Sequence, residues 1–229
     1  MSPNPKIVQL RQQLAERFPG LRTNIGDLPA RTHDGWPTGL QQIDHLLEGG
    51  LNKSAITEIV GEKNGSGGAL VISWLLRKAA AENQIFALVD GQDSFDPTGF
   101  DQKTLTRLLW IRCKTADQAL KATDLVLRDR NLPLLILDLQ LNPSTQLRKI
   151  PSSIWYRLQR IVEATSTIFV VFTPHAMVGC AQSRLNLQSH FALNALEKNQ
   201  SELLGKLKVE LTQHRLHVSH TEEQVAKAG

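Results

Sequence analysis

Five short apolar runs alternate with longer stretches of mixed polarity through the middle of the chain. The runs are four to six residues long and rich in leucine, β-branched and aromatic residues, as is typical of buried strands. They occupy residues 55–60, 85–90, 108–111, 134–138 and 168–172. The stretches between them predict helices over 69–82, 102–107, 116–129 and 153–165. This alternation predicts an α/β fold in which helices flank a largely parallel sheet on both faces.

The segments on either side of this core have different patterns. Near the start of the chain, apolar residues recur at spacings of three and four, which predicts an amphipathic helix over 5–18. A polar connector follows it, so we divide the chain into a helix and connector (1–37), a core (38–211) and a polar tail (212–229). Alternating stretches at 190–196 and 205–211 predict an antiparallel ribbon that extends the sheet.

Composition narrows the class of protein. With 229 residues, 41% of them hydrophobic, the chain can bury one sizeable core. A formal net charge of +4 permits contact with nucleic acid but does not require it. Cys113 and Cys180 are too few for a disulfide framework or a zinc site, so we expect no metal and a reducing compartment. Since no apolar stretch approaches about 20 residues and the N-terminus lacks a signal-peptide core, we expect a cytoplasmic protein without membrane contact.

A glycine-rich segment, Gly-Glu-Lys-Asn-Gly-Ser-Gly-Gly at 61–68, joins the first predicted strand to the helix over 69–82. The order strand, glycine loop, helix is that of a phosphate loop, in which backbone N–H groups surround the phosphates. A lysine then reaches the β- and γ-phosphate oxygens and a hydroxyl ligates magnesium. Here these two positions are Gly67 and Gly68. Without the lysine and the hydroxyl, the charge that develops on the phosphates is not stabilised, so we expect no ATP hydrolysis.

Three interpretations of this loop differ in what it binds. Lys63, earlier in the loop, would supply the missing charge in an atypical ATPase. A nest of backbone N–H groups would bind an anion without any side chain. A tight turn would bind nothing, and we favour it, expecting no cofactor and no ATP binding. The residues concerned are Gly61, Lys63, Asn64, Gly65, Ser66, Gly67 and Gly68.

Several short motifs resemble, in order, the ATPase core of the RecA recombinases from about Thr38 to about Leu211. They lead into the first strand, follow it with the glycine loop, and continue through the second strand, the next helix and the Walker B strand. The matching residues are Thr38-Gly39, Ile43-Asp44, Leu46-Leu47, Gly49-Gly50-Leu51, Thr57-Glu58-Ile59, Leu88 to Pro97, Gln118-Ala119-Leu120 with Asp124, and Leu135-Ile136-Leu137-Asp138. The resemblance implies a RecA-like core.

Departures from the RecA pattern imply that the ATPase is inactive. Gln92 stands where the family has the glutamate that activates water, and an amide cannot act as a general base. Thr173 and Pro174 replace an asparagine–glutamine pair whose glutamine senses the γ-phosphate. Only Asp138, at the Walker B position, matches the catalytic set. The segments after the fourth and fifth strands are too short for the family's DNA-binding loops, so we do not expect a RecA-type filament.

A compact RecA-like core with a degenerate nucleotide site is similar to the ImuA proteins and to the SulA division inhibitors. ImuA proteins accompany an inactive Y-family polymerase homologue and an error-prone polymerase in damage-induced mutagenesis. This resemblance implies an accessory factor in SOS-induced translesion synthesis, with a Y-family polymerase homologue or RecA as its partner. The alternative is an inhibitor that binds FtsZ. The 37 residues before Thr38 and the length of the chain favour the ImuA type.

Basic residues suggest weak direct contact with DNA. One group is Arg148, Lys149, Arg157 and Arg160, and another is Arg107, Arg112 and Lys114. Such groups are more often a solvated face than a binding site, and we favour that interpretation for both.

Overall fold

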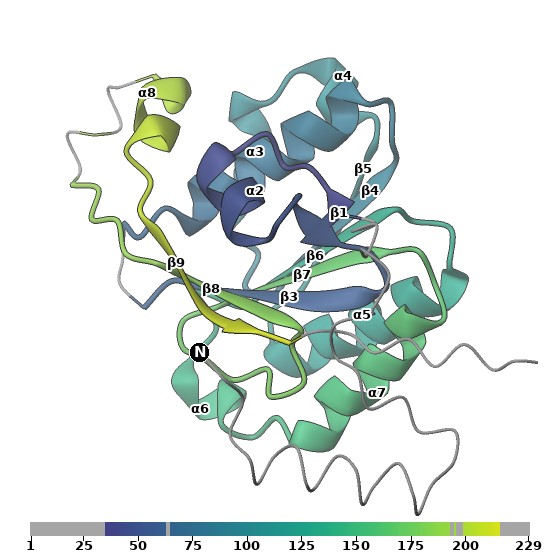
Figure 1. Ribbon diagram of the computed structural model, residues 1–229. Helices are drawn as coiled ribbons and strands as arrows, with labels where there is room; N and C mark the ends of the chain where they lie inside the picture. Colours follow the sequence, from purple (N-terminus) through teal and green to yellow (C-terminus); the bar gives the residue numbers. More distant parts are fainter. Residues whose placement is uncertain (1–34, 63–64, 193–194, 196–198, 216–229) are drawn as a thin grey trace, which may run out of the picture. The chain divides into compact units, whose positions relative to one another are not determined.

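The computed structural model describes residues 35–62, 65–192, 195 and 199–215. All of them belong to a compact unit that begins at Asp34 (Figure 1). The predicted helix over 5–18, the loop residues Lys63 and Asn64, and the tail from residue 216 onward lie outside the described residues.

A seven-stranded sheet forms the centre of this unit, with the strand order β5-β4-β6-β7-β3-β8-β9. Every neighbouring pair is parallel except β8 and β9, which are antiparallel. The strands are β3 (Ala55–Val60), β4 (Phe86–Asp90), β5 (Leu108–Arg112), β6 (Leu134–Asp138), β7 (Ile168–Thr173), β8 (Ser183–Leu187) and β9 (Val209–His214). The largely parallel sheet and its five predicted strands are confirmed, and the architecture is compatible with a P-loop or RecA-like fold.

Helices lie between the strands on both faces of the sheet (Figure 1). All four predicted helices are present, as α3 (Gly68–Ala81), α4 (Gln102–Leu105), α5 (Ala116–Asp129) and α7 (Ser152–Glu163). The Thr115 hydroxyl caps α5 by accepting a hydrogen bond from the Gln118 N–H at 3.3 Å. Shorter elements that the pattern does not predict are β1 (Gly35–Trp36), α2 (Gln41–Leu46), β2 (Leu51–Asn52), the 3-10 turn η2 (Pro97–Gly99), α6 (Ser144–Leu147) and α8 (Gln200–Gly205).

Two hydrophobic cores lie on opposite faces of the sheet. One packs α2 and α3 against alternate residues of the central strands, and the other packs α5 and α7 against the remaining ones. Every residue of β3 and of β7 is buried, because helices cover both faces of these strands. Within the described residues, no helix is long and apolar enough to cross a membrane.

The antiparallel ribbon at the end of the chain is present, but its first strand is not the predicted one. That strand is β8. Of the predicted stretch 190–196, residues 190–192 and 195 are not part of a strand, and residues 193–194 and 196 lie outside the described residues. The chain turns away after β8 because the Phe191 N–H donates to the Gly65 carbonyl oxygen at 2.9 Å. The second strand, β9, overlaps the predicted stretch 205–211 and begins four residues later.

Candidate functional site

The glycine loop connects β3 to α3 at the carboxyl edge of the sheet. Its first residue, Gly61, donates its N–H to the carbonyl oxygen of Thr173 on β7 at 2.9 Å. Gly65 has a φ of +77° and Gly67 a φ of +101°, which L side chains rarely adopt. Backbone geometry therefore accounts for glycine at both positions.

The side chain of Gln140 lies against both ends of this loop. A Cβ atom at Gly61 would lie 2.6 Å from Gln140 Nε2, and one at Gly68 would lie 2.6 Å from Gln140 Cδ. Ser66 contacts the same region, since its Oγ would be 2.5 Å from the Gly61 Cβ. Gln140 follows the end of β6, where its N–H donates to Asp138 Oδ1 at 3.0 Å. The chain's own carboxamide thus occupies the space between the two ends of the loop.

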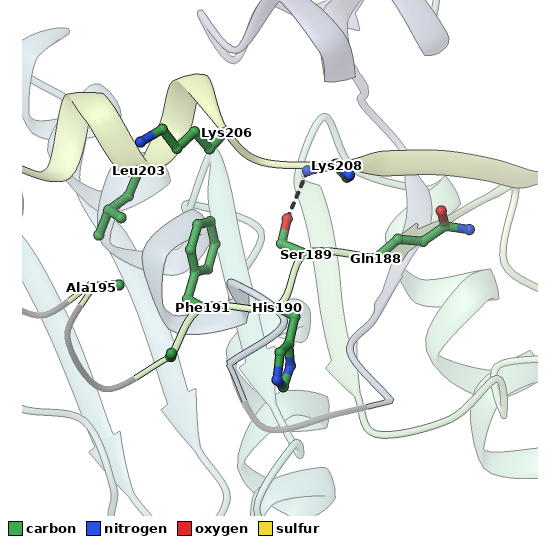
Figure 2. A pocket seen from close by; sticks show the side chains of 9 residues that line it. Gln188, Ser189, His190, Phe191, Ala195, Leu203, Lys206 and Lys208 are labelled. Atoms are coloured by element: carbon green, nitrogen blue, oxygen red, sulfur yellow. Dashed lines mark hydrogen bonds between the residues drawn. The ribbon is translucent and has the colours of Figure 1, made fainter.

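Two apolar residues cover another side of the loop. A Cβ atom at Gly67 would lie 2.7 Å from Leu207 Cδ1 and 3.2 Å from Phe191 Cε2. Phe191 also lines a cavity of about 400 Å³ next to α8, together with Ser189 and Leu203 (Figure 2). The segment after β8 is therefore packed onto the loop.

These contacts leave little space for the lysine and the hydroxyl-bearing residue that a working phosphate loop has at these positions. A lysine at Gly67 would need a left-handed backbone and would meet Leu207, while a hydroxyl-bearing residue at Gly68 would overlap the Gln140 carboxamide. The sequence pattern identified the two substitutions but gave no reason to assign a role to Gln140.

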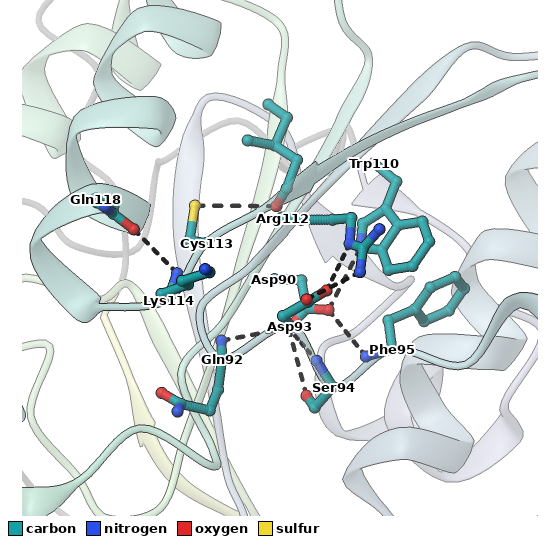
Figure 3. A network of polar contacts seen from close by, with 11 residues as sticks. Asp90, Gln92, Asp93, Ser94, Phe95, Trp110, Arg112, Cys113, Lys114 and Gln118 are labelled. Carbon is teal, nitrogen blue, oxygen red and sulfur yellow. Dashed lines mark hydrogen bonds and ion pairs between the residues drawn. The ribbon is translucent and has the colours of Figure 1, made fainter.

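Asp138, the Walker B match, lies at the end of β6 and pairs in register with Asp90 of β4. Burial raises the pKa of Asp138 to about 6; the Gln140 N–H lowers it, and the Asp90 charge adds to the rise. Asp90 is buried, and it accepts hydrogen bonds from the Ser94 N–H at 3.0 Å and the Phe95 N–H at 2.8 Å (Figure 3). Asp90 therefore holds the loop that follows β4, a role that the sequence pattern did not suggest.

Gln92, which the RecA resemblance places at the catalytic glutamate, is hydrogen-bonded to the loop after β6. Its Oε1 accepts a hydrogen bond from Asn142 Nδ2 at 3.3 Å, and the same nitrogen donates to the Gly91 carbonyl oxygen at 2.8 Å. Close by, the Arg112 guanidinium forms a bidentate ion pair with Asp93 (Figure 3). The β4 and β6 loops are thus fastened to each other and to the edge strand.

Thr173, which the RecA resemblance places at the sensor position, contacts a buried residue of the neighbouring strand β3. Its hydroxyl donates to Glu58 Oε1 at 3.0 Å, and Glu58 is fully buried. The next residue, Pro174, has no N–H to donate.

The structure separates the four residues predicted to contact DNA. Arg157 and Arg160 line a cleft together with Arg128 and Arg130, which the sequence pattern did not single out. Arg148 and Lys149 are exposed in the turn before α7 and do not line that cleft.

The described residues contain no group of three or more histidine, cysteine or acidic side chains placed to hold a metal ion. Cys113 and Cys180 are free and buried, and burial raises the pKa of both thiols. The chain matches no protein-family model and no curated protein sequence. Its assignment therefore depends on the fold and on the contacts around the glycine loop.

Replacing Asp138 by asparagine tests the environment of this carboxyl group. Because its folded pKa is raised above the ordinary 3.8 to about 6, the folded state keeps a proton that the unfolded state has lost between these values. Stability from this group is therefore full below pH 4 and decreases as the pH rises to about 6. We expect Asp138→Asn to flatten that decrease and to raise stability at pH 7 by up to about 3 kcal/mol. Urea denaturation at a series of pH values measures it, and an unchanged pH profile would contradict the expectation.

Proposed function

We propose that this protein is a catalytically inactive RecA-like interaction protein, an accessory factor of the ImuA type in SOS-induced translesion synthesis. The observation that carries the inactive assignment is the position of the Gln140 carboxamide against Gly61 and Gly68. A hydroxyl-bearing side chain at Gly68, which the RecA resemblance assigns to magnesium binding, would have to displace this carboxamide.

Other positions that the RecA resemblance marks as catalytic have internal contacts that support the same proposal. Gln92 is hydrogen-bonded to Asn142, and Thr173 to Glu58. The lysine position, Gly67, has a backbone conformation that favours glycine. Gln92 and Thr173 are thus both used in contacts within the fold, which fits a protein that acts through its surface.

Hydrolysis is tested with the purified chain in a phosphate-release assay containing ATP, magnesium and single-stranded DNA. We expect no activity above background, either from the wild type or from the variant Gly67→Lys/Gly68→Thr that restores the two missing side chains. The variant is also expected to melt at a lower temperature, because strain at Gly67 costs about 1–3 kcal/mol. Wild-type hydrolysis that is lost in Lys63→Ala would instead identify an atypical ATPase.

The partner is tested by co-expression with the Y-family polymerase homologue and with RecA from the same organism. We expect at least one of them to co-purify with the chain at a fixed ratio on size-exclusion chromatography. If neither does, and overproduction causes filamentation of undamaged cells, the ImuA-type proposal is wrong and an FtsZ-binding inhibitor of the SulA type replaces it.

A further inference from the structure

A cleft lined by four arginines lies at the edge of the sheet opposite the glycine loop. Its volume is about 340 Å³, and its lining residues are Arg128, Arg130, Arg157, Arg160, Ile161 and Ala164. They come from α5, α7 and the C-cap residue of each helix, and each helix leads into the amino end of a parallel strand. The cleft is therefore independent of the candidate nucleotide site.

The charge of this cleft is only partly balanced. Asp124 on α5 pairs with Arg128 at 2.7 Å and with Arg157 at 3.0 Å, and the hydrogen bond from Arg128 holds the pKa of Asp124 below its usual value. Among the described residues, neither Arg130 nor Arg160 has an acidic partner within ion-pair distance. Asp124 therefore pairs with two of the four guanidinium groups of the cleft.

Other acidic side chains on these helices do not enter the cleft lining. Asp129 accepts a hydrogen bond from Asn131 at 3.1 Å, and Glu163 accepts one from Gln159 at 2.7 Å. Both residues are exposed beside the cleft. Asp129 and Glu163 offset part of the positive charge near the cleft, while the cleft lining itself contains four guanidinium groups and no carboxylate.

Two large apolar side chains extend this surface along the helices. Tyr156, four residues before Arg160 on α7, is 52% exposed, and Leu125, three residues before Arg128 on α5, is 70% exposed. Residues three or four apart lie on the same face of a helix. An aromatic ring is thus available next to the arginines.

We propose that this cleft binds single-stranded nucleic acid, with the phosphate backbone on the arginines and a base stacked on Tyr156. All four cationic residues of the cleft are arginine, whose planar guanidinium forms paired hydrogen bonds with phosphate oxygens. A basic groove with a neighbouring aromatic ring is the arrangement by which proteins bind single strands without sequence preference. This inference goes beyond the proposed protein partner and does not depend on it.

Fluorescence anisotropy with a labelled thymidine oligonucleotide of about 20 nucleotides tests the proposal. We expect Arg130→Gln/Arg160→Gln to weaken binding about tenfold or more. The slope of log K against log salt should fall by about 1.4, since two phosphate contacts are lost. Lys103→Gln/Lys208→Gln, which removes two exposed charges elsewhere, is the matched control and should have a much smaller effect. All variants should keep the wild-type melting temperature.

Tyr156→Ala separates stacking from charge. It should lower the affinity about fivefold or more while leaving the salt slope unchanged. The proposal is overturned if the cleft and control variants weaken binding equally, or if only Arg148→Gln/Lys149→Gln weakens it. Equal affinity for duplex DNA or for polyglutamate would also overturn it, because either result would indicate a different partner.

Discussion

Replacement of Glu58 by alanine is expected to lower the free energy of unfolding by about 3–5 kcal/mol, because it leaves a buried charge without its partner. Glu58 lies in the middle of the sheet and is 0% exposed. Its Oε2 pairs with Arg184 Nε at 2.5 Å, and its Oε1 accepts from the Thr173 hydroxyl at 3.0 Å and from the Met177 N–H at 2.8 Å. The carboxylate therefore fastens β3 to β7 and β8 and to the turn between those two strands.

Chemical denaturation at neutral pH measures this loss of stability. Two further variants serve as a control and as a test of its cause. Glu210→Ala removes an exposed carboxylate from β9 and should change stability by less than about 0.5 kcal/mol. Glu58→Ala/Arg184→Leu removes both charges and should be more stable than Glu58→Ala alone, since the cost comes from the unpaired guanidinium. A loss below about 1 kcal/mol for Glu58→Ala would show that the ion pair does not hold the strands together.

The central strands could be predicted because each is a short run of mostly apolar residues. Burial on both faces of a parallel sheet makes such strands apolar without alternation, and their length of five or six residues, as in β6 and β7, favours a strand over a buried helix. The helices could be predicted from the longer stretches of mixed polarity between these strands, as for α5. These signals are local, so one sequence is enough to detect them.

Strand β8 could not be predicted because its pattern includes a charged residue whose partner is distant. Only two of its five residues are apolar, and Arg184 is accommodated through Glu58, 126 residues away in the chain, which pairs with it. The short sequence Ser-Arg-Leu-Asn-Leu therefore lacks the strand signal that its position in the sheet implies.

The candidate sites were only partly predictable for the same reason. The loop substitutions at Gly67 and Gly68 follow from motif spacing, whereas the Gln140 side chain reaches the loop only when β6 lies near β3 in the sheet. Similarly, the arginine cleft combines residues of α5 and α7, which are adjacent only after packing. The group predicted from the sequence therefore included Arg148 and Lys149, which do not line the cleft. It omitted Arg128 and Arg130, which do.

Substitution of Gly50 by alanine is expected to destabilise the protein by about 3 kcal/mol or more, because strain and steric overlap add. Gly50 has a φ of +115°, and a Cβ atom there would overlap the carbonyl oxygen of Trp36, lying 2.6 Å from its carbonyl carbon and 2.7 Å from Pro37 Cα. These are backbone atoms, and the antiparallel pairing of β1 with β2 fixes Trp36 opposite Leu51. Neither side can therefore move without breaking the ribbon.

Opening of the β1–β2 ribbon would also disturb the hydrophobic core beneath α3, the helix that follows the glycine loop. Trp36 and Leu51 are both buried in the hydrophobic core formed by α2 and α3, and α3 begins at the end of that loop. Gly99→Ala is the matched control: a Cβ atom there would meet nothing within 4 Å, so its effect should stay within about 0.5 kcal/mol. Thermal and urea denaturation of both variants provides the measurement. Equal stability of the two would mean that the ribbon can open at little cost and that Trp36 does not depend on it for its position.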